Sequence, residues 1–235
     1  MNEFQRYTGS TVISGGQTGV DLAALRAAQC LGYKTGGYAP KGFKTQVGRQ
    51  LGLGPNFGLT EHQGGYSART RANVEQADAT LVIAADMQSV DTALTIVACE
   101  AFSKPILTIE VAKTESLIMP MPLLSSEQVS NAVDWIVGML EAAIKDRGMF
   151  MLNVAGNSNT SAPGIFTPAF IGLLQTLHSV QLVICEKHGF AHDDRVTWIA
   201  NKLTGSDVAK ALDNNFNAYP DLNPRHQGPL IVDAE

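Results

Sequence analysis

The chain lacks a long hydrophobic run. Hydrophobic residues make up 45% of its 235 residues, but no stretch of about 18 consecutive apolar residues is present, which is the length that crosses a bilayer. The first residues, Met1 to Arg6, are too polar to form the apolar core of a signal peptide. We therefore expect neither membrane insertion nor secretion, and we expect a cytoplasmic protein.

Cysteine is also scarce. The three cysteines, Cys30, Cys99 and Cys185, are odd in number, far apart and embedded in apolar sequence. This pattern argues against a disulfide framework and favours buried thiols in a reducing compartment.

Basic residues are fewer than acidic ones, which gives the chain a net charge of −5. They are also unevenly distributed along the chain. The first 75 residues carry eight lysines and arginines against four carboxylates, which gives +4 there and leaves −9 in the rest. Cations gathered around one segment suit a small anionic ligand, whereas nucleic acid requires a broad basic face. We therefore predict a small phosphorylated molecule as partner, with no nucleic acid and no membrane. The alternative is that these cations are scattered, solvated side chains.

Short apolar runs alternate with helical patterns along the chain. Candidate strands cover residues 11–14, 79–85, 105–109, 150–155 and 180–185, and candidate helices cover 22–31, 93–102 and 126–146, with weaker ones at 66–74 and 196–203. This alternation predicts an α/β fold with a Rossmann-like, doubly wound, mostly parallel sheet whose ligands bind at the carboxyl ends of the strands. We expect one domain over residues 1–175 and a C-terminal extension over 176–235 packed on it, ending in a polar tail from residue 214.

A glycine-rich turn separates the first candidate strand from the first helix. Its backbone N–H groups point outward at the positive end of a helix dipole, which is a common way to bind phosphate. The spacing matches neither Gly-x-Gly-x-x-Gly nor the P-loop. Asp21 either caps the helix or binds a ligand hydroxyl. The candidate ligand residues here are Ser14, Gly15, Gly16, Gln17, Thr18, Gly19 and Asp21.

Two cationic segments follow. Residues 35–70 are rich in glycine and poor in periodicity, as in a functional loop region. Lys41 and Lys44 lie on a turn within it, and Arg69 lies near the start of the helical pattern over residues 66–74. A guanidinium beside backbone amides binds phosphate well, so we predict ligand contact for these three residues. Arg71 is equally suited to a solvated or ion-paired position.

The ordered motifs resemble the molybdenum cofactor carrier protein family, within the SLOG superfamily of Rossmann-like nucleotide-sensing proteins. The resemblance covers about residues 8–170, through Ser14–Asp21, Pro40–Gly42, Tyr66-x-x-Arg69-Thr70-x-x-Asn73-Val74, Ala77–Leu81 and Leu152–Gly156. It implies a homo-oligomer, a dimer or tetramer, that binds a phosphorylated, pterin or nucleotide-like ligand and stores the molybdenum cofactor without transforming it. It also adds Thr70 and Asn73 to the candidate site.

The chain departs from that family at residues 88–95. Relatives usually carry a glycine-rich turn followed by threonine there. This chain has Gln88-Ser89-Val90-Asp91-Thr92-Ala93-Leu94-Thr95, in which Thr92 and Thr95 remain as candidate hydroxyl donors. Asp91 would bring negative charge near a phosphate unless it points away, so a phosphate-bearing ligand other than the molybdenum cofactor is a second expectation.

Two other functions stay open. The first is sequestration of nucleotide-derived signalling molecules of the cyclic ADP-ribose type. The second is hydrolysis of nucleoside monophosphates, which would require a carboxylate such as Glu100. We favour a non-catalytic binding protein and expect no metal site, because residues 188–194, which hold two histidines, are better explained as a surface loop.

Overall fold

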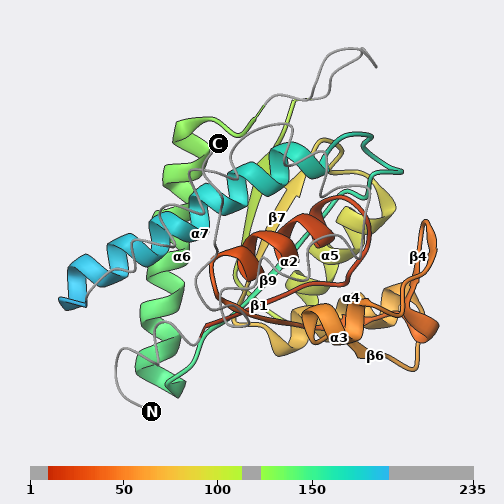
Figure 1. Ribbon diagram of the computed structural model, residues 1–235, viewed down its shortest axis with the longest axis horizontal. Helices are drawn as coiled ribbons and strands as arrows, with labels where there is room; N and C mark the ends of the chain where they lie inside the picture. The colour runs from red at the N-terminus through yellow and green to blue at the C-terminus, as the bar shows by residue number, and fades with distance from the viewer. Residues whose placement is uncertain (1–9, 113–122, 191–235) are drawn as a thin grey trace, which may run out of the picture.

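The computed structural model describes residues 10–112 and 123–190. Its centre is a five-stranded sheet in the order β2-β1-β9-β7-β8, in which every neighbouring pair is parallel. The strands are β1 (Thr11–Ile13), β2 (Lys34–Gly36), β7 (Ala79–Ala84), β8 (Ile106–Glu110) and β9 (Met151–Gly156). The predicted Rossmann-like α/β fold is confirmed (Figure 1).

Helices flank the sheet, and the sequence predicted each of them except the last. They are α2 (Val20–Cys30), α4 (Tyr66–Gln76), α5 (Val90–Ala101), α6 (Ser126–Arg147) and α7 (Phe166–His188). Helix α6 shows how local sequence sets the ends. The Ser125 hydroxyl accepts from the Gln128 N–H at 3.1 Å while the Gln128 side chain accepts from the Ser125 N–H at 2.8 Å, and the left-handed Gly148 ends the helix.

Two hydrophobic clusters hold the helices to the sheet. The larger one joins α2, α6 and α7 to side chains such as Leu81 and Ile83 of β7. The smaller one contains Val74 of α4 with Ala98 and Cys99 of α5. Figure 1 shows α2 and α7 in front of the sheet, and they pack against each other. Cysteines 30, 99 and 185 are free thiols, and burial raises the pKa of Cys30 to about 12.

The strand predicted at residues 180–185 is wrong, because this segment lies inside α7. Its run of valine, leucine and isoleucine packs along a helix that is apolar on most sides. Helix α7 is long and apolar enough by composition to span a bilayer. Polar residues interrupt its apolar residues, so the sequence contains no continuous apolar run there. However, 67% of its most apolar stretch is buried inside the protein. The Tyr33 hydroxyl donates to the Leu177 carbonyl at 2.9 Å, as expected of a core helix.

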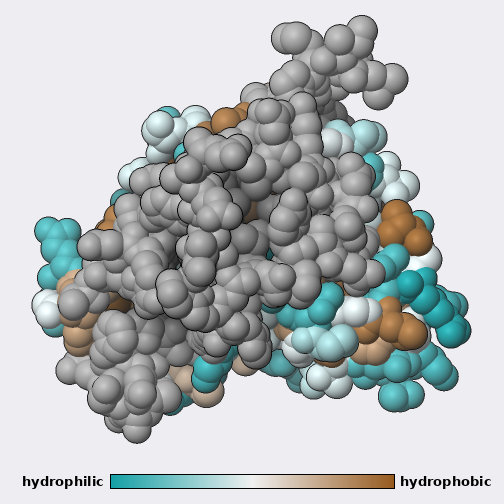
Figure 2. Space-filling model, viewed as in Figure 1, coloured by the Kyte–Doolittle hydropathy of each residue, from teal (hydrophilic) through white to brown (hydrophobic). Residues whose placement is uncertain are grey.

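Residues 35–70 are more ordered than a loop. They form the small parallel pair β3 (Tyr38–Ala39) and β6 (Thr60–Glu61), the 3₁₀ turn η1 (Lys41–Phe43), the hairpin β4 (Lys44–Thr45) and β5 (Gly48–Arg49), and α3 (Leu53–Phe57). We call residues 41–50 the arm. It projects from the body in Figure 1, and Figure 2 shows a mainly hydrophilic surface on that side with isolated hydrophobic patches.

The expected boundary at residue 175 falls within α7, which runs unbroken from the core through that position. The predicted helix at 196–203, the polar tail and His192 lie outside the described residues. The division into a domain and a C-terminal extension therefore stays a prediction.

Candidate functional site

The glycine turn lies between the end of β1 and the first residue of α2. Gly16 and Gly19 have φ angles of 71° and 81°, in the left-handed region that favours glycine. A Cβ on Gly19 would approach the carbonyl oxygen of Asn157 to 2.5 Å. The turn is anchored at its start by Ser14, whose hydroxyl donates to the Val154 carbonyl at 2.6 Å. The loop is therefore held tightly against the end of β9.

Several backbone donors of this turn belong to buried residues and have no acceptor in the described part of the chain. Across residues 10–112 and 123–190, the N–H groups of Gly15, Gly16, Thr18 and Gly19 donate to no acceptor, although all four residues are buried. Buried N–H groups are nearly always paired in folded proteins. Unpaired donors at the start of a helix are therefore the feature of this turn that best fits an anion.

Arg69 and Asp21 meet beside this turn. Arg69 Nη1 lies 3.2 Å from Asp21 Oδ2, and both residues are buried. The same carboxylate oxygen accepts from the Gln17 N–H at 3.2 Å. The carboxylate of Asp21 thus binds one of the N–H donors of the loop and places a negative charge beside it. Arg69 Nε is buried and has no partner in the described structure, so the guanidinium retains donor capacity.

Burial raises the pKa of Asp21 above its ordinary value of 3.8. The positive charge of Arg69 and the Gln17 N–H oppose this shift, whereas the negative charge of Asp91 adds to it. The two carboxyl groups and the guanidinium therefore share one electrostatic environment.

The arm contacts the turn through two hydrogen bonds. Gln17 Nε2 donates to the Lys44 carbonyl at 3.0 Å, and the Thr18 hydroxyl donates to Gln46 Oε1 at 3.3 Å. Gln17 Oε1 is buried without a partner in the described structure. The Lys41 and Lys44 side chains are exposed. Since the arm covers the turn, a ligand would reach these donors beneath or beside residues 44–46.

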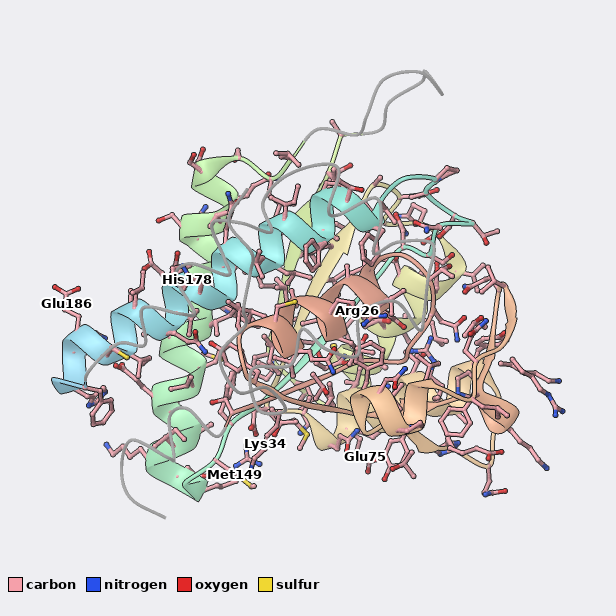
Figure 3. The ribbon with its side chains drawn as sticks, viewed as in Figure 1. Arg26, Lys34, Glu75, Met149, His178 and Glu186 are labelled. Carbon is pink, nitrogen blue, oxygen red and sulfur yellow. The ribbon has the colours of Figure 1, made fainter. Side chains whose placement is uncertain are left out.

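The other basic residues of the first 75 are not all directed at the turn. Arg26 is buried on α2 with its guanidinium 5.0 Å from the centre of the Phe57 ring. Figure 3 shows Arg26 within the body and Lys34 at the periphery. Arg71 is exposed, with its guanidinium 4.9 Å from the centre of the Phe102 ring. The excess of positive charge in this segment is therefore spread over several surfaces.

Asn73 and Thr70 lie one and two turns before the end of α4. Asn73 Oδ1 accepts from the Tyr38 N–H at 2.7 Å and its Nδ2 donates to the Tyr38 carbonyl at 3.1 Å. The side-chain amide of Asn73 thereby makes the two backbone hydrogen bonds that a neighbouring strand would make, and it holds β3 in place. Thr70 is buried beside Arg69. The structure thus shows a fold-supporting contact for Asn73, and ligand contact by either residue stays a prediction.

Residues 88–95 face the loop that follows β9. Asp91 Oδ2 accepts from the Ser158 N–H and the Ser161 hydroxyl, each at 3.2 Å. The Thr92 hydroxyl accepts from Asn157 Nδ2 at 2.8 Å, and the Thr95 hydroxyl donates to the Asp91 carbonyl at 3.1 Å. Both threonine hydroxyls are therefore engaged within the protein.

Asn157 is a central residue that the sequence did not single out. Its Oδ1 accepts from the N–H groups of Ala85 and Asp86, both at 2.8 Å. Its Nδ2 contacts the Asp86 carbonyl and the hydroxyls of Ser89 and Thr92. One fully buried side chain thus joins the end of β9 to the β7–α5 turn. These contacts span 65 to 72 residues of sequence, so no local pattern could reveal them.

A cavity of about 520 Å³ opens at the carboxyl ends of β7 and β8, lined by Ala85, Asp86, Met87, Gln88 and Glu110. Two of its five lining residues carry carboxylates, which suits a phosphate poorly. The glycine turn and Arg69 are better matched to an anion than this cavity.

The strand order itself indicates the class of protein. If the strands are numbered from β9 instead of β1, the order β2-β1-β9-β7-β8 becomes 3-2-1-4-5, which is the order of a doubly wound nucleotide-binding sheet. The chain is thus a Rossmann-like α/β protein whose central strand, β9, is the last of the described strands in sequence.

Comparison with known proteins agrees with this arrangement. The chain belongs to the circularly permutated YpsA SLOG family, whose model matches residues 12–177. A crystal structure of a protein from Syntrophus aciditrophicus SB, named "Putative molybdenum carrier protein", is 30% identical with a TM-score of 0.55, and the match covers 72% of this chain and 94% of that one. Comparison with curated proteins gave no match. The resemblance inferred from the motifs is confirmed, and the family supports a nucleotide-related binding function.

Proposed function

We propose that the protein binds a small phosphorylated ligand without transforming it, and carries or stores that ligand. The observation that supports this most directly is that the N–H groups of four buried residues, Gly15, Gly16, Thr18 and Gly19, have no acceptor in the described structure. A phosphate oxygen is a strong acceptor for such donors at a helix start. Arg69 would supply the countercharge.

The molybdenum cofactor is the first ligand to test, because the similar protein of Syntrophus aciditrophicus SB is named "Putative molybdenum carrier protein". The donor set fits the phosphate group of such a ligand, since backbone amides and a guanidinium are typical phosphate partners. Gln17 Oε1 is buried and has no partner among the described residues, so it offers an acceptor for a hydroxyl or N–H group on the same ligand. A nucleotide satisfies the same donors and acceptor, so it is the second candidate.

Storage is favoured over hydrolysis by the position of Glu100. This carboxylate is exposed in the last turn of α5, about 15 Å along the helix axis from its first residue. The first turn of α5 is the end that faces the loop after β9, because Asp91 binds Ser158 there. Glu100 is therefore poorly placed to act on a ligand at the glycine turn.

The test is to identify and then rebind the ligand. The protein is purified under mild conditions, its small molecules are released by denaturation, and mass spectrometry identifies them. Calorimetry then measures binding of the molybdenum cofactor, nucleoside monophosphates and inorganic phosphate to the emptied protein. We expect saturable binding of a phosphorylated compound that is recovered intact. Release of a free base from a nucleoside monophosphate, or no binding by any phosphorylated compound, would refute the proposal.

A further inference from the structure

A buried carboxylate lies among the donors of the glycine turn. Asp21 is the second residue of α2, and its Oδ2 lies 3.2 Å from the Gln17 backbone nitrogen and 3.2 Å from Arg69 Nη1. Asp21 is 4% exposed and Arg69 is 7% exposed, so solvent screens their charges weakly. An anion held by the same loop and the same guanidinium therefore meets a negative charge at short range.

Two unpartnered side-chain atoms beside Asp21 point to a ligand independently of the start of α2. Arg69 Nε is buried and has no partner among the described residues, and its guanidinium lies against Gly15. Gln17 Oε1 is also buried without a partner in that part of the chain, and it belongs to the residue whose N–H binds Asp21. A phosphate group that pairs with Arg69 Nε and with the N–H groups of residues 15–19 thus lies beside the carboxylate.

A hydrogen between two such groups removes the repulsion. Like charges close together in a buried site do not both stay ionised, and a hydrogen placed between two oxygens converts the repulsion into a charge-assisted hydrogen bond. An ionised carboxylate has about four lone-pair sites and no donor. Because Gln17 and Arg69 each make one bond to Oδ2, Asp21 keeps the capacity to accept a further hydrogen.

The charged and polar groups around Asp21 favour this role. Burial raises the pKa of Asp21, and the negative charge of Asp91 on α5 adds to the rise. The positive charge of Arg69 on α4, the Gln17 N–H and the Ser14 hydroxyl oppose it. Because the balance is a raised pKa, this carboxylate holds a hydrogen more strongly than an exposed one does.

We propose that Asp21 selects a phosphate group that carries a hydrogen, which the carboxylate accepts, over an oxyanion that carries none. The inference rests on the proposed function, since it names the form of phosphate that the same site takes. Inorganic phosphate keeps a P–OH group near neutral pH, whereas sulfate is fully ionised and sets a bare oxygen against Asp21. A group that is repelled or left unpaired by the wrong ligand is an effective source of selectivity.

A phosphate monoester has a second pKa of about 6, so near neutral pH it is mostly a dianion without a hydrogen. It therefore binds this site as its monoanion and takes up one proton from solvent. If Asp21 only held Arg69 in place, no proton would be taken up, and loss of Asp21 would weaken the binding of phosphate and sulfate by the same factor.

Isothermal calorimetry with inorganic phosphate and with sulfate, near neutral pH and at equal ionic strength, tests the proposal on the emptied full chain. Asp21→Asn keeps the shape of the side chain and an oxygen that accepts from Arg69, and it adds an N–H that donates to either anion. Asp134→Asn is the matched control, because it removes the same charge at an exposed position on α6. Circular dichroism checks that both variants fold.

We expect wild type and Asp134→Asn to bind phosphate at least roughly tenfold more tightly than sulfate. Asp21→Asn should bring the two affinities within about threefold of each other. Equal affinities in wild type, or a preference for phosphate that survives in Asp21→Asn, would overturn this inference and leave the proposed function standing. Binding of neither anion by wild type would refute the proposed function and this inference with it.

A measurement on wild type keeps the proposal testable if Asp21→Asn does not fold. Calorimetry of methyl phosphate binding in buffers with different heats of ionisation counts the protons that binding takes up. We expect uptake of about one proton per site near neutral pH. Binding without proton uptake would overturn the inference, because the carboxylate would then face a phosphate that carries no hydrogen.

Discussion

The guanidinium of Arg69 lies directly against Gly15, so closely that a Cβ on Gly15 would overlap Arg69 Nη1. The absence of a side chain at residue 15 is thus what allows a buried cation to reach the glycine turn. Asp21 holds that cation from the other side at 3.2 Å. Backbone donors, a guanidinium and a carboxylate are thereby gathered at one point from two segments 48 residues apart.

Gly15→Ala should damage this arrangement. The added methyl group cannot share space with Arg69, so the guanidinium must move, at a cost of about 1–3 kcal/mol in unfolding free energy. Gly138→Ala in α6 is the control, because nothing lies within 4 Å of its Cβ position. That change should stabilise the protein by about 0.5–1 kcal/mol. Urea denaturation measures the unfolding free energy of both variants. Equal changes in the two would show that the contact between Arg69 and Gly15 is loose.

Arg69→Ala should weaken the binding of a phosphorylated ligand by about 1–3 kcal/mol, the range for losing a hydrogen bond to a charged group. Arg71→Ala removes the same charge from the same helix at an exposed position, so it should leave affinity nearly unchanged. Isothermal calorimetry with the phosphorylated ligand that is recovered from the purified protein measures both. Unchanged affinity in the Arg69 variant would remove that residue from the site.

Stability should depend on pH through Asp21. Because its pKa is raised in the folded protein, the folded state binds the proton more tightly than the unfolded chain does. Unfolding free energy should therefore fall as the pH rises from about 3.8, the ordinary value, through the folded-state pKa. Asp21→Asn lacks this loss, so its stability relative to wild type should increase with pH over that range. Denaturation at a series of pH values measures the slope, and a slope of opposite sign would mean that Arg69 outweighs burial.

Asn157→Ala should be strongly destabilising. It removes the acceptor of the buried Ala85 N–H and of the half-buried Asp86 N–H, and we expect a loss of about 3 kcal/mol in unfolding free energy. Asn153→Ala is the comparison, because Asn153 is equally buried and its Nδ2 makes a 3.3 Å bond to the Thr80 hydroxyl. That variant should lose about 1 kcal/mol. A similar loss in both would contradict the view that Asn157 joins two segments.

Much of the fold followed from local sequence. The apolar runs at β1, β7, β8 and β9 and the spacing of α2, α5 and α6 are signals contained within one element. The strand predicted at residues 180–185 was wrong because the local sequence there does not decide between strand and helix. A short run of β-branched and aliphatic residues fits a buried strand and a buried helix equally well, and only the packing of α7 against α2 distinguishes them.

The candidate site was predictable as a segment but not as a set of contacts. The glycines before α2 marked the turn, because strand, glycines and helix follow one another in sequence. The pairing of Asp21 with Arg69, the contacts of Gln17 and Thr18 with the arm, and the role of Asn157 depend on residues brought together by folding. No spacing along the chain encodes these contacts.

The central claim is that the backbone N–H groups of the glycine turn bind a phosphate group. Amide chemical shifts followed by nuclear magnetic resonance, while inorganic phosphate or the identified ligand is added, test it directly. We predict large, saturable shifts at Gly15, Gly16, Thr18 and Gly19. Saturable shifts confined to other residues, with these four unchanged, would contradict the account.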